Sequence, residues 1–101
     1  MIKWIFLMMT LMPVRTLAGD VNVGKLKSST CVACHGTVGI SANALWPNLA
    51  GQKDRYLVEQ MKAFRDGLRK SDLMSPVAKM LSDRDMEDLA AYFTQLKAEK
   101  E

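Results

Sequence analysis

Two cysteines and the only histidine of the chain lie within five consecutive residues, Cys31-Val32-Ala33-Cys34-His35. A structural zinc ion needs four Cys or His ligands, and these three side chains are all that the chain has. A redox-active C-x-x-C motif of the thioredoxin kind sits beside a βαβ unit, and no alternating run of β-branched residues predicts strands here. Two cysteines three apart at a helix end project to the same side, so both sulfurs can reach one edge of a single flat group.

C-x-x-C-H is the attachment signature of c-type haem, in which both thiols bond covalently to vinyl groups of the ring. The histidine after the second cysteine then lies under the ring centre, where it can bind the iron. Gly36 comes next, and because it has no side chain the backbone can pass close to the ring. The motif therefore predicts one haem c attached at Cys31 and Cys34, with His35 as an iron ligand.

The first 18 residues are typical of an export signal. Lys3 supplies a positive charge, residues 4–14 form a nearly unbroken apolar run, and Thr16-Leu17-Ala18 matches a small-residue cleavage site. We expect a signal peptide over 1–18, a periplasmic location and a mature haem-binding domain over 19–101. The alternative is an uncleaved N-terminal anchor, although the apolar run is shorter than the about 20 residues that a membrane span needs.

The chain that remains after cleavage is small and nearly neutral, because Lys3 and Arg15 leave with the signal. No basic cluster indicates nucleic-acid binding. A domain of about 80 residues is marginal for an independent apolar core and usually needs a disulfide, a metal or a large cofactor. This shortage is a second reason to expect a non-protein group in the interior.

The hydrophobic pattern predicts an all-α fold with three main helices and two long loops. The first helix is expected over about 21–31, with Asp20 as its N-cap and with Val23 and Leu26 facing inward. A glycine-rich loop over 36–53 follows, and a loop of that length in so small a domain is usually functional.

The second helix is expected over about 54–66, with Gly67 as its C-terminal cap. Its apolar stripe consists of Leu57, Met61, Phe64 and Leu68. A second loop over 69–81 holds Met74 and Met80, and part of it can form a helical turn.

The third helix begins after Ser82, which forms with Asp85 the layout of a capping box. Asp83 and Asp85 also suit the positive end of a helix dipole. Its buried stripe is expected to consist of Met86, Leu89, Phe93 and Leu96.

Taken together, these features resemble the class I cytochrome c family, above all its small bacterial periplasmic members and the single domains of their dihaem relatives. The resemblance covers residues 20–97. Besides Cys31-Val-Ala-Cys-His-Gly, it rests on Trp46-Pro-Asn-Leu-Ala-Gly-Gln, Tyr56-Leu, Ala63-Phe-Arg-Asp-Gly, Met74 in its loop, and Leu81-Ser-Asp followed by Leu89-Ala-Ala-Tyr-Phe. It implies the small cytochrome c fold, with three main helices and loops wrapped around one haem.

The resemblance implies Met74 as the sixth iron ligand, because the family places a methionine in the loop shortly before the Leu-Ser-Asp start of the last helix. A thioether is a soft ligand suited to haem iron, and His/Met ligation raises the reduction potential. Met80 lies in the same loop and is the main rival, whereas Met61 and Met86 lie on helix stripes. Pro47 resembles the proline whose carbonyl accepts a hydrogen bond from the proximal histidine; the alternative is an ordinary loop proline.

Packing roles follow from the same resemblance. Leu49, Phe64 and Leu68 are expected to contact the haem. Gly24 and Tyr92 are expected to mark the crossing of the first and last helices.

Two features of the chain keep alternatives open. Trp46 lines the haem edge or reaches a propionate, or else serves packing alone. A docking patch for partners is expected to comprise Lys53, Arg55, Arg69 and Lys70, and the alternative is an ordinary solvated face.

The resemblance implies outer-sphere electron transfer by an iron without an open coordination site, so we expect an electron carrier rather than an enzyme. The implied partners are redox proteins such as a terminal oxidase, a reductase or a larger catalytic subunit, with no nucleic acid and no stable membrane anchor. One alternative is the haem subunit of a larger periplasmic oxidoreductase. Another is a gas sensor or weak peroxidase with a labile sixth ligand, which carbon monoxide binding by the reduced protein would reveal.

Overall fold

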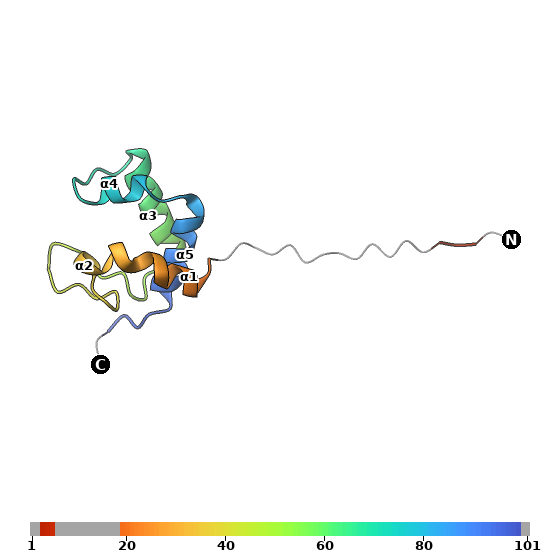
Figure 1. The fold of residues 1–101 in the computed structure, drawn as a ribbon, viewed down its shortest axis with the longest axis horizontal. Helices are drawn as coiled ribbons and strands as arrows, with labels where there is room; N and C mark the ends of the chain where they lie inside the picture. Colours follow the sequence, from red (N-terminus) through yellow and green to blue (C-terminus); the bar gives the residue numbers. More distant parts are fainter. Residues whose placement is uncertain (1–2, 6–18, 100–101) are drawn as a thin grey trace.

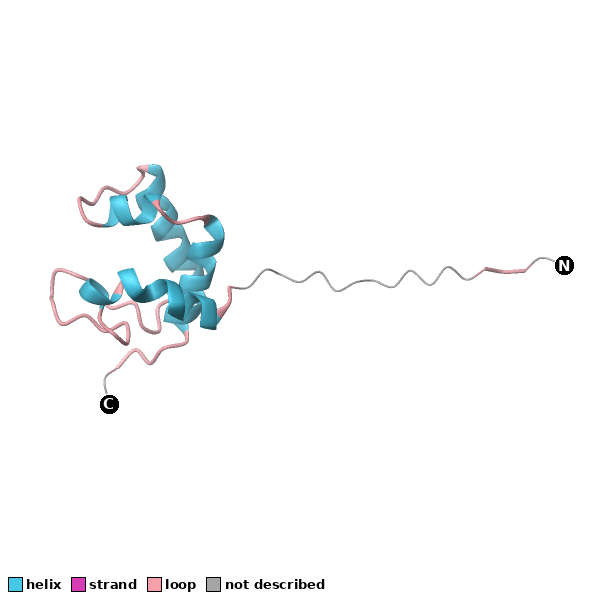
Figure 2. Cartoon of the chain, viewed as in Figure 1, coloured by secondary structure: helices cyan, strands magenta, loops and turns pink. Residues whose placement is uncertain are grey.

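The computed structural model of the protein describes residues 3–5 and 19–99. Its elements are α1 (Val21–Lys27), the 3₁₀ turn η1 (Ser28–Thr30), α2 (Val32–His35), α3 (Asp54–Asp66), α4 (Met74–Lys79) and α5 (Asp83–Thr94). The described residues contain no strand, which confirms the predicted all-α class (Figure 2). No described helix is long and apolar enough to cross a bilayer. The predicted signal peptide over 1–18 lies outside the described residues, apart from 3–5.

The first predicted helix is divided, and its predicted inward face is wrong. α1 ends at Lys27, because the Ser28 hydroxyl donates to the carbonyl of Lys25 (2.7 Å) and a single 3₁₀ turn follows. Leu26 is 79% exposed, and Val23 is exposed as well. Helix α1 therefore contacts the rest of the molecule by a face without large apolar side chains.

Gly24 makes this contact possible, because it is the buried residue of α1. An added Cβ at Gly24 would collide with the carbonyl of Asp88 and would lie 2.8 Å from the Cβ of Tyr92. The predicted crossing of the first and last helices at Gly24 and Tyr92 is confirmed. The predicted N-cap is confirmed too, since Asp20 accepts the N–H of Val23 at 3.0 Å.

Helix α3 has the predicted bounds, and Gly67 caps it in the left-handed conformation with φ of 81°. The prediction that Leu68 continues the apolar stripe is wrong, because Leu68 is 87% exposed. The helix has already ended at Asp66, and the turn at Gly67 carries Leu68 off the helical face.

Helix α5 begins with the predicted capping box: Asp85 N–H donates to Ser82 Oγ at 3.0 Å, and Ser82 N–H donates to Asp85 Oδ2 at 2.9 Å. It also carries most of the core. The buried cluster consists of Leu57, Leu89, Ala90, Tyr92 and Phe93, with Leu49, Met61 and Leu96 packed against it. Met86 is buried as predicted, and Leu96 is partly buried.

Helix α5 joins two halves of the molecule (Figure 1). Helices α3 and α4 pack together on one side, and α3 also packs on α5. Helices α1 and α2 and the loop over 36–53 lie on the other side, where α1 packs on α5. The segment expected to be a loop with a helical turn contains α4, which lies across from α2.

Candidate haem-binding site

A cavity of about 380 Å³ lies between these two halves of the molecule. The side chains that line it are mostly apolar, and they come from both halves and from α5. They include Cys31, Cys34, His35, Trp46, Pro47, Leu49, Leu57, Met61, Phe64, Met74, Leu89 and Phe93. Its volume is typical of cofactor sites in proteins.

His35 ends α2 and is only 7% exposed. Its Nδ1 lies 2.9 Å from the carbonyl oxygen of Pro47. Because a carbonyl can only accept, Nδ1 carries the proton and Nε2 keeps the lone pair that a metal requires. A carbonyl on the second nitrogen fixes the ring of a ligating histidine and makes it a stronger electron donor.

The loop over 36–53 delivers this carbonyl by folding back on itself. Gly39 O accepts the N–H groups of Leu49 (2.8 Å) and Ala50 (2.9 Å), which closes the loop on either side of its tip. Pro47 lies just before this closure, so its carbonyl is held at the histidine by backbone hydrogen bonds. The loop is therefore long enough to fold back and place the carbonyl oxygen of Pro47 beside the imidazole of His35.

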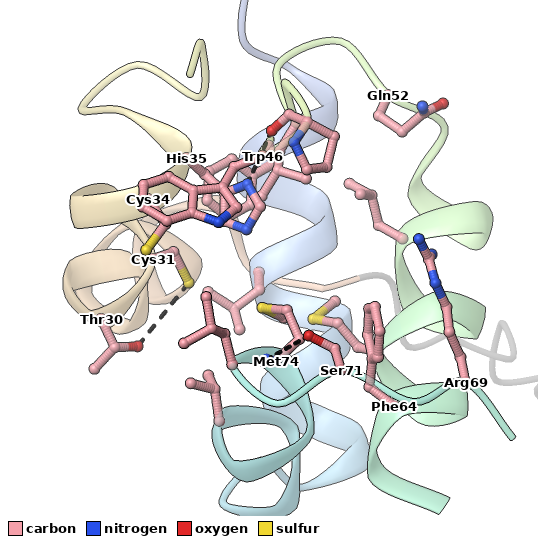
Figure 3. A pocket seen from close by; sticks show the side chains of 18 of the residues that line it. Thr30, Cys31, Cys34, His35, Trp46, Gln52, Phe64, Arg69, Ser71 and Met74 are labelled. Atoms are coloured by element: carbon pink, nitrogen blue, oxygen red, sulfur yellow. Dashed lines mark hydrogen bonds between the residues drawn. The ribbon is translucent and has the colours of Figure 1, made fainter. Parts of the chain in front are cut away.

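Cys31 and Cys34 form no disulfide and lie on the wall of the cavity that α2 forms (Figure 3). Burial raises the pKa of the Cys31 thiol, against a smaller lowering by the hydroxyl of Thr30. Redox-active cysteines in C-x-x-C enzymes have lowered pKa values instead. The environment of these thiols therefore favours stable attachment of a group over thiol–disulfide exchange.

The opposite wall carries Met74, the first residue of α4 (Figure 3). Ser71 holds this helix start, since its Oγ accepts the N–H of Met74 at 3.0 Å. Met80, the predicted rival, is 73% exposed and does not line the cavity. Met61 does line it, but lies within α3 and packs against the core cluster. Of the two methionines of the second loop, Met74 alone faces the cavity.

The other residues predicted to contact the haem divide into two groups. Trp46, Pro47, Leu49 and Phe64 line the cavity, whereas Leu68 does not. The structure adds lining residues for which no haem contact was predicted, among them Leu45, Gln52, Tyr56, Leu73, Val77 and Leu81. Most lie in loops or in the short helix α4, where hydrophobic periodicity gives no signal.

The four residues of the predicted docking patch do not lie together. Lys53 and Arg55 lie at the start of α3, and Arg69 and Lys70 follow its end. A helix of this length separates the two pairs by roughly 20 Å. Arg69 and Lys70 line the cavity instead.

The side chains of the cavity fit a haem c. Two thiols and an imidazole on one wall, a thioether on the other and apolar side chains between them suit a flat apolar ring with iron at its centre. The fold and the site together define a small all-α protein that binds haem c.

Comparison with known families identifies the chain further. The family model for cytochrome c matches residues 23–97, and the chain belongs to this family. It binds haem c covalently through Cys31 and Cys34 of its C-x-x-C-H motif, and it functions in electron transfer.

Three relatives show how the chain compares in length. Cytochrome c-554(548) of Halomonas halodenitrificans is 50% identical over 80 residues, which cover 76% of this chain and 96% of that protein. The crystal structure of cytochrome c4 from Pseudomonas stutzeri matches with a TM-score of 0.75 and 40% identity, over 79% of this chain and 47% of that one. The thiosulfate dehydrogenase TsdBA from Marichromatium purpuratum matches with a TM-score of 0.73 and 35% identity, over 78% of this chain and 20% of that one. The chain thus spans nearly all of the first relative but less than half of the other two.

Proposed function

We propose that this protein is a periplasmic monohaem electron carrier whose iron is bound axially by His35 and Met74. The observation that supports this proposal is that these two side chains line opposite walls of one cavity (Figure 3). The chain holds each of them in place: the carbonyl of Pro47 orients the imidazole, and the hydroxyl of Ser71 accepts the backbone N–H of the methionine.

The haem iron, when bound, supplies a one-electron couple between the ferrous and ferric states. His35 and Met74 would hold the iron from opposite walls of the cavity and would leave no coordination site open to a substrate. The neutral thioether favours the ferrous state and raises the potential. Leu57, Leu89 and Phe93 exclude water from the ring and disfavour additional charge on the iron.

The axial assignment is tested by Met74→Ala in the holoprotein. This change should abolish the weak near-infrared sulfur-to-iron band of the ferric state, lower the reduction potential and let the reduced protein bind carbon monoxide. Met80→Ala is the matched control, because it removes the same side chain from a position outside the cavity. The control should retain the band and the potential.

Loss of the band in Met80→Ala and its retention in Met74→Ala would contradict the assignment. Retention of the band in both variants would contradict the assignment and would favour Met61, which also lines the cavity, as the sulfur ligand. Met61→Leu should then lose the band. Rapid carbon monoxide binding by the unmodified reduced protein at neutral pH would favour a gas sensor or weak peroxidase instead.

A second candidate role is that of a haem subunit in a larger oxidoreductase. It is favoured by the likeness to TsdBA, in which the matched part is 20% of the solved chain. Purification from the native source at low salt distinguishes the two roles. A stoichiometric larger subunit that co-elutes with the haem would support the subunit role, and elution of the cytochrome alone would support a free carrier.

Export belongs to the same proposal, because haem attachment at Cys31 and Cys34 outside the cytoplasm requires it, and Thr16-Leu17-Ala18 places the cleavage after Ala18. The intact mass of the protein from the periplasmic fraction should equal residues 19–101 plus one haem. The mass of the full chain plus haem, found in the membrane fraction, would instead support the uncleaved anchor.

A further inference from the structure

The part of the cavity wall that faces away from Cys31 and Cys34 carries positive charge (Figure 3). Arg69 and Lys70 both line the cavity, and none of the described lining residues is an Asp or Glu. The remaining titratable groups that line it are the two cysteines, the histidine of the haem motif and Tyr56. A positive rim beside an apolar space is suited to a flat ligand with an anionic edge.

The sequence at the end of α3 places Arg69 at this wall. Gly67 turns the chain in the left-handed conformation, and the N–H of Arg69 then bonds to Ala63 O at 3.1 Å. The Arg69 guanidinium stacks over the Phe64 ring, 4.6 Å from its centroid, and its Nη1 donates to Gln60 Oε1 at 2.7 Å. The charged group is therefore positioned by neutral neighbours alone.

Two other arginines of the described chain have carboxylate partners, whereas Arg55 has none and does not line the cavity. Arg65 pairs with Asp83 at 2.6 Å, and Arg84 pairs with Asp88 at 3.3 Å. Within residues 19–99, no carboxylate lies within ion-pair distance of Arg69. A positioned guanidinium without a protein counter-charge, on a cavity wall without acids, points to a carboxylate on the bound group.

We propose that Arg69, assisted by Lys70, binds a propionate carboxylate of the haem. The two vinyl-bearing pyrroles of haem are not those that carry the propionates, so attachment at Cys31 and Cys34 directs the propionates toward the opposite wall. A guanidinium matches a carboxylate with two parallel charge-assisted hydrogen bonds. The positive charge of Arg69 beside the ring favours the ferrous state and thereby raises the potential. This inference rests on the proposed function, because it requires a haem seated between the two axial ligands.

Arg69→Gln in the holoprotein tests the inference by spectroelectrochemical titration over about pH 5 to 9. At high pH the variant should have a lower midpoint potential than the wild type. At an applied potential equal to the wild-type midpoint, the oxidised form of the variant should therefore exceed its reduced form several-fold. The difference should shrink as the pH falls, because a propionate without its cation takes up a proton more readily. Arg69→Lys should restore most of the potential.

Arg55→Gln is the matched control, because it removes the same charge from the start of α3, outside the cavity. It should follow the wild type at every pH. An Arg69→Gln variant that matches the wild type throughout would overturn the inference, and so would an equal shift in Arg55→Gln, since net charge alone would then account for it. Lys70→Gln should lower the potential by less, and it serves as the test if Arg69→Gln does not accumulate.

The near-infrared band, measured in the same samples, separates this inference from the axial assignment. Its presence in the wild type and in Arg69→Gln would show that the sixth ligand is unchanged. An altered potential would then be caused by the lost charge beside the propionates and not by a change at the iron. Its absence from the wild type would contradict the proposed Met74 ligation instead.

Discussion

Gly36 directly follows the histidine of the haem motif and adopts φ of 86° and ψ of 156°. This conformation is essentially restricted to glycine. An added Cβ would in addition collide with the carbonyl oxygen of Ile40. The residue after His35 thus directs the chain out of α2 and into the loop that brings Pro47 back to the imidazole.

Gly36→Ala should therefore lower the free energy of unfolding by about 2 kcal/mol or more, since backbone strain of this kind costs about 1–3 kcal/mol before the collision is counted. Gly67→Ala is the matched control: its φ of 81° is also positive, but an added Cβ there would meet no atom within 4 Å. It should cost about 1 kcal/mol. Guanidinium unfolding of both holoproteins, followed at the main haem absorption band, measures the difference, and equal costs would contradict this account.

Residues whose role depends on their spacing in the chain could be predicted from the sequence. Cys31, Cys34 and His35 lie at positions i, i+3 and i+4, so a helix places all three on one face and on one wall of the cavity. Gly36 was predicted to let the backbone pass close to the haem, and the structure shows that it also adopts a backbone conformation that other residues avoid. Gln60 and Phe64, which position Arg69, could not be predicted as its partners, because the turn at Gly67 decides where the guanidinium goes.

Helices with their own start and stop signals were predictable as elements. The capping box at Ser82 and the glycine at Gly67 operate within a few residues, so sequence alone locates the start of α5 and the end of α3. The inward face of α1 was not predictable from hydrophobicity. It is determined by the close approach of α5 to Gly24, and the larger apolar side chains of α1 are left in solvent.

The capping box should contribute measurably to the stability of α5. Ser82→Ala removes the acceptor of the Asp85 N–H and leaves that donor to water, which typically costs about 1 kcal/mol. Ser82→Asp keeps an acceptor in the same place and should retain most of the stability. Chemical denaturation of the holoproteins measures both, and an unchanged midpoint in Ser82→Ala would show that the box does not stabilise the fold.

The contact of α1 with α5 contains a buried carboxylate. Asp88 is only 2% exposed, and it accepts hydrogen bonds from the backbone N–H of Asp20 (2.8 Å) and from Lys27 Nζ (2.7 Å). Burial acts to raise the pKa of Asp88, but these two hydrogen bonds, together with the charges of Lys27 and Arg84, outweigh it and hold the pKa below the ordinary 3.8. A hydrogen bond from Lys27 also lowers the pKa of Asp85.

These depressed pKa values make the contact sensitive to acid. A carboxylate with a lowered pKa binds fewer protons in the folded than in the unfolded state, so its stabilisation is full above about pH 3.8 and is lost as the pH falls through the folded value. Lys27→Met should reduce the free energy of unfolding at neutral pH. The difference in stability between this variant and the wild type should shrink as the pH falls below about 3.8. Lys25→Met, a loss of charge on the same helix, is the control, and a gap of constant size at all pH values would contradict the linkage.

At the scale of the whole molecule, the two halves have little core in common apart from α5. The buried cluster is formed mainly by α5 residues together with Leu57 of α3, and many of its partly buried neighbours also line the cavity. The fold class followed from the helical pattern, and the motif and the small size of the chain predicted a group in the interior. The position of α4 across the cavity from α2 could not be predicted from local sequence, because it depends on contacts between segments that are far apart in the chain.

The haem should therefore be required for the fold as well as for electron transfer. Cys31→Ala combined with Cys34→Ala removes both covalent bonds, while the helix signals of α3 and α5 remain intact. We expect this chain to be weakly helical by far-ultraviolet circular dichroism and rapidly cleaved by protease, because a domain of this size buries too little apolar surface to offset its conformational entropy. The single variant Cys31→Ala retains one attachment point and should be intermediate between the double variant and the wild type. A double variant that unfolds cooperatively and resists protease as the holoprotein does would show that the helices form a sufficient core by themselves, and that the haem only occupies a site which the chain already holds open.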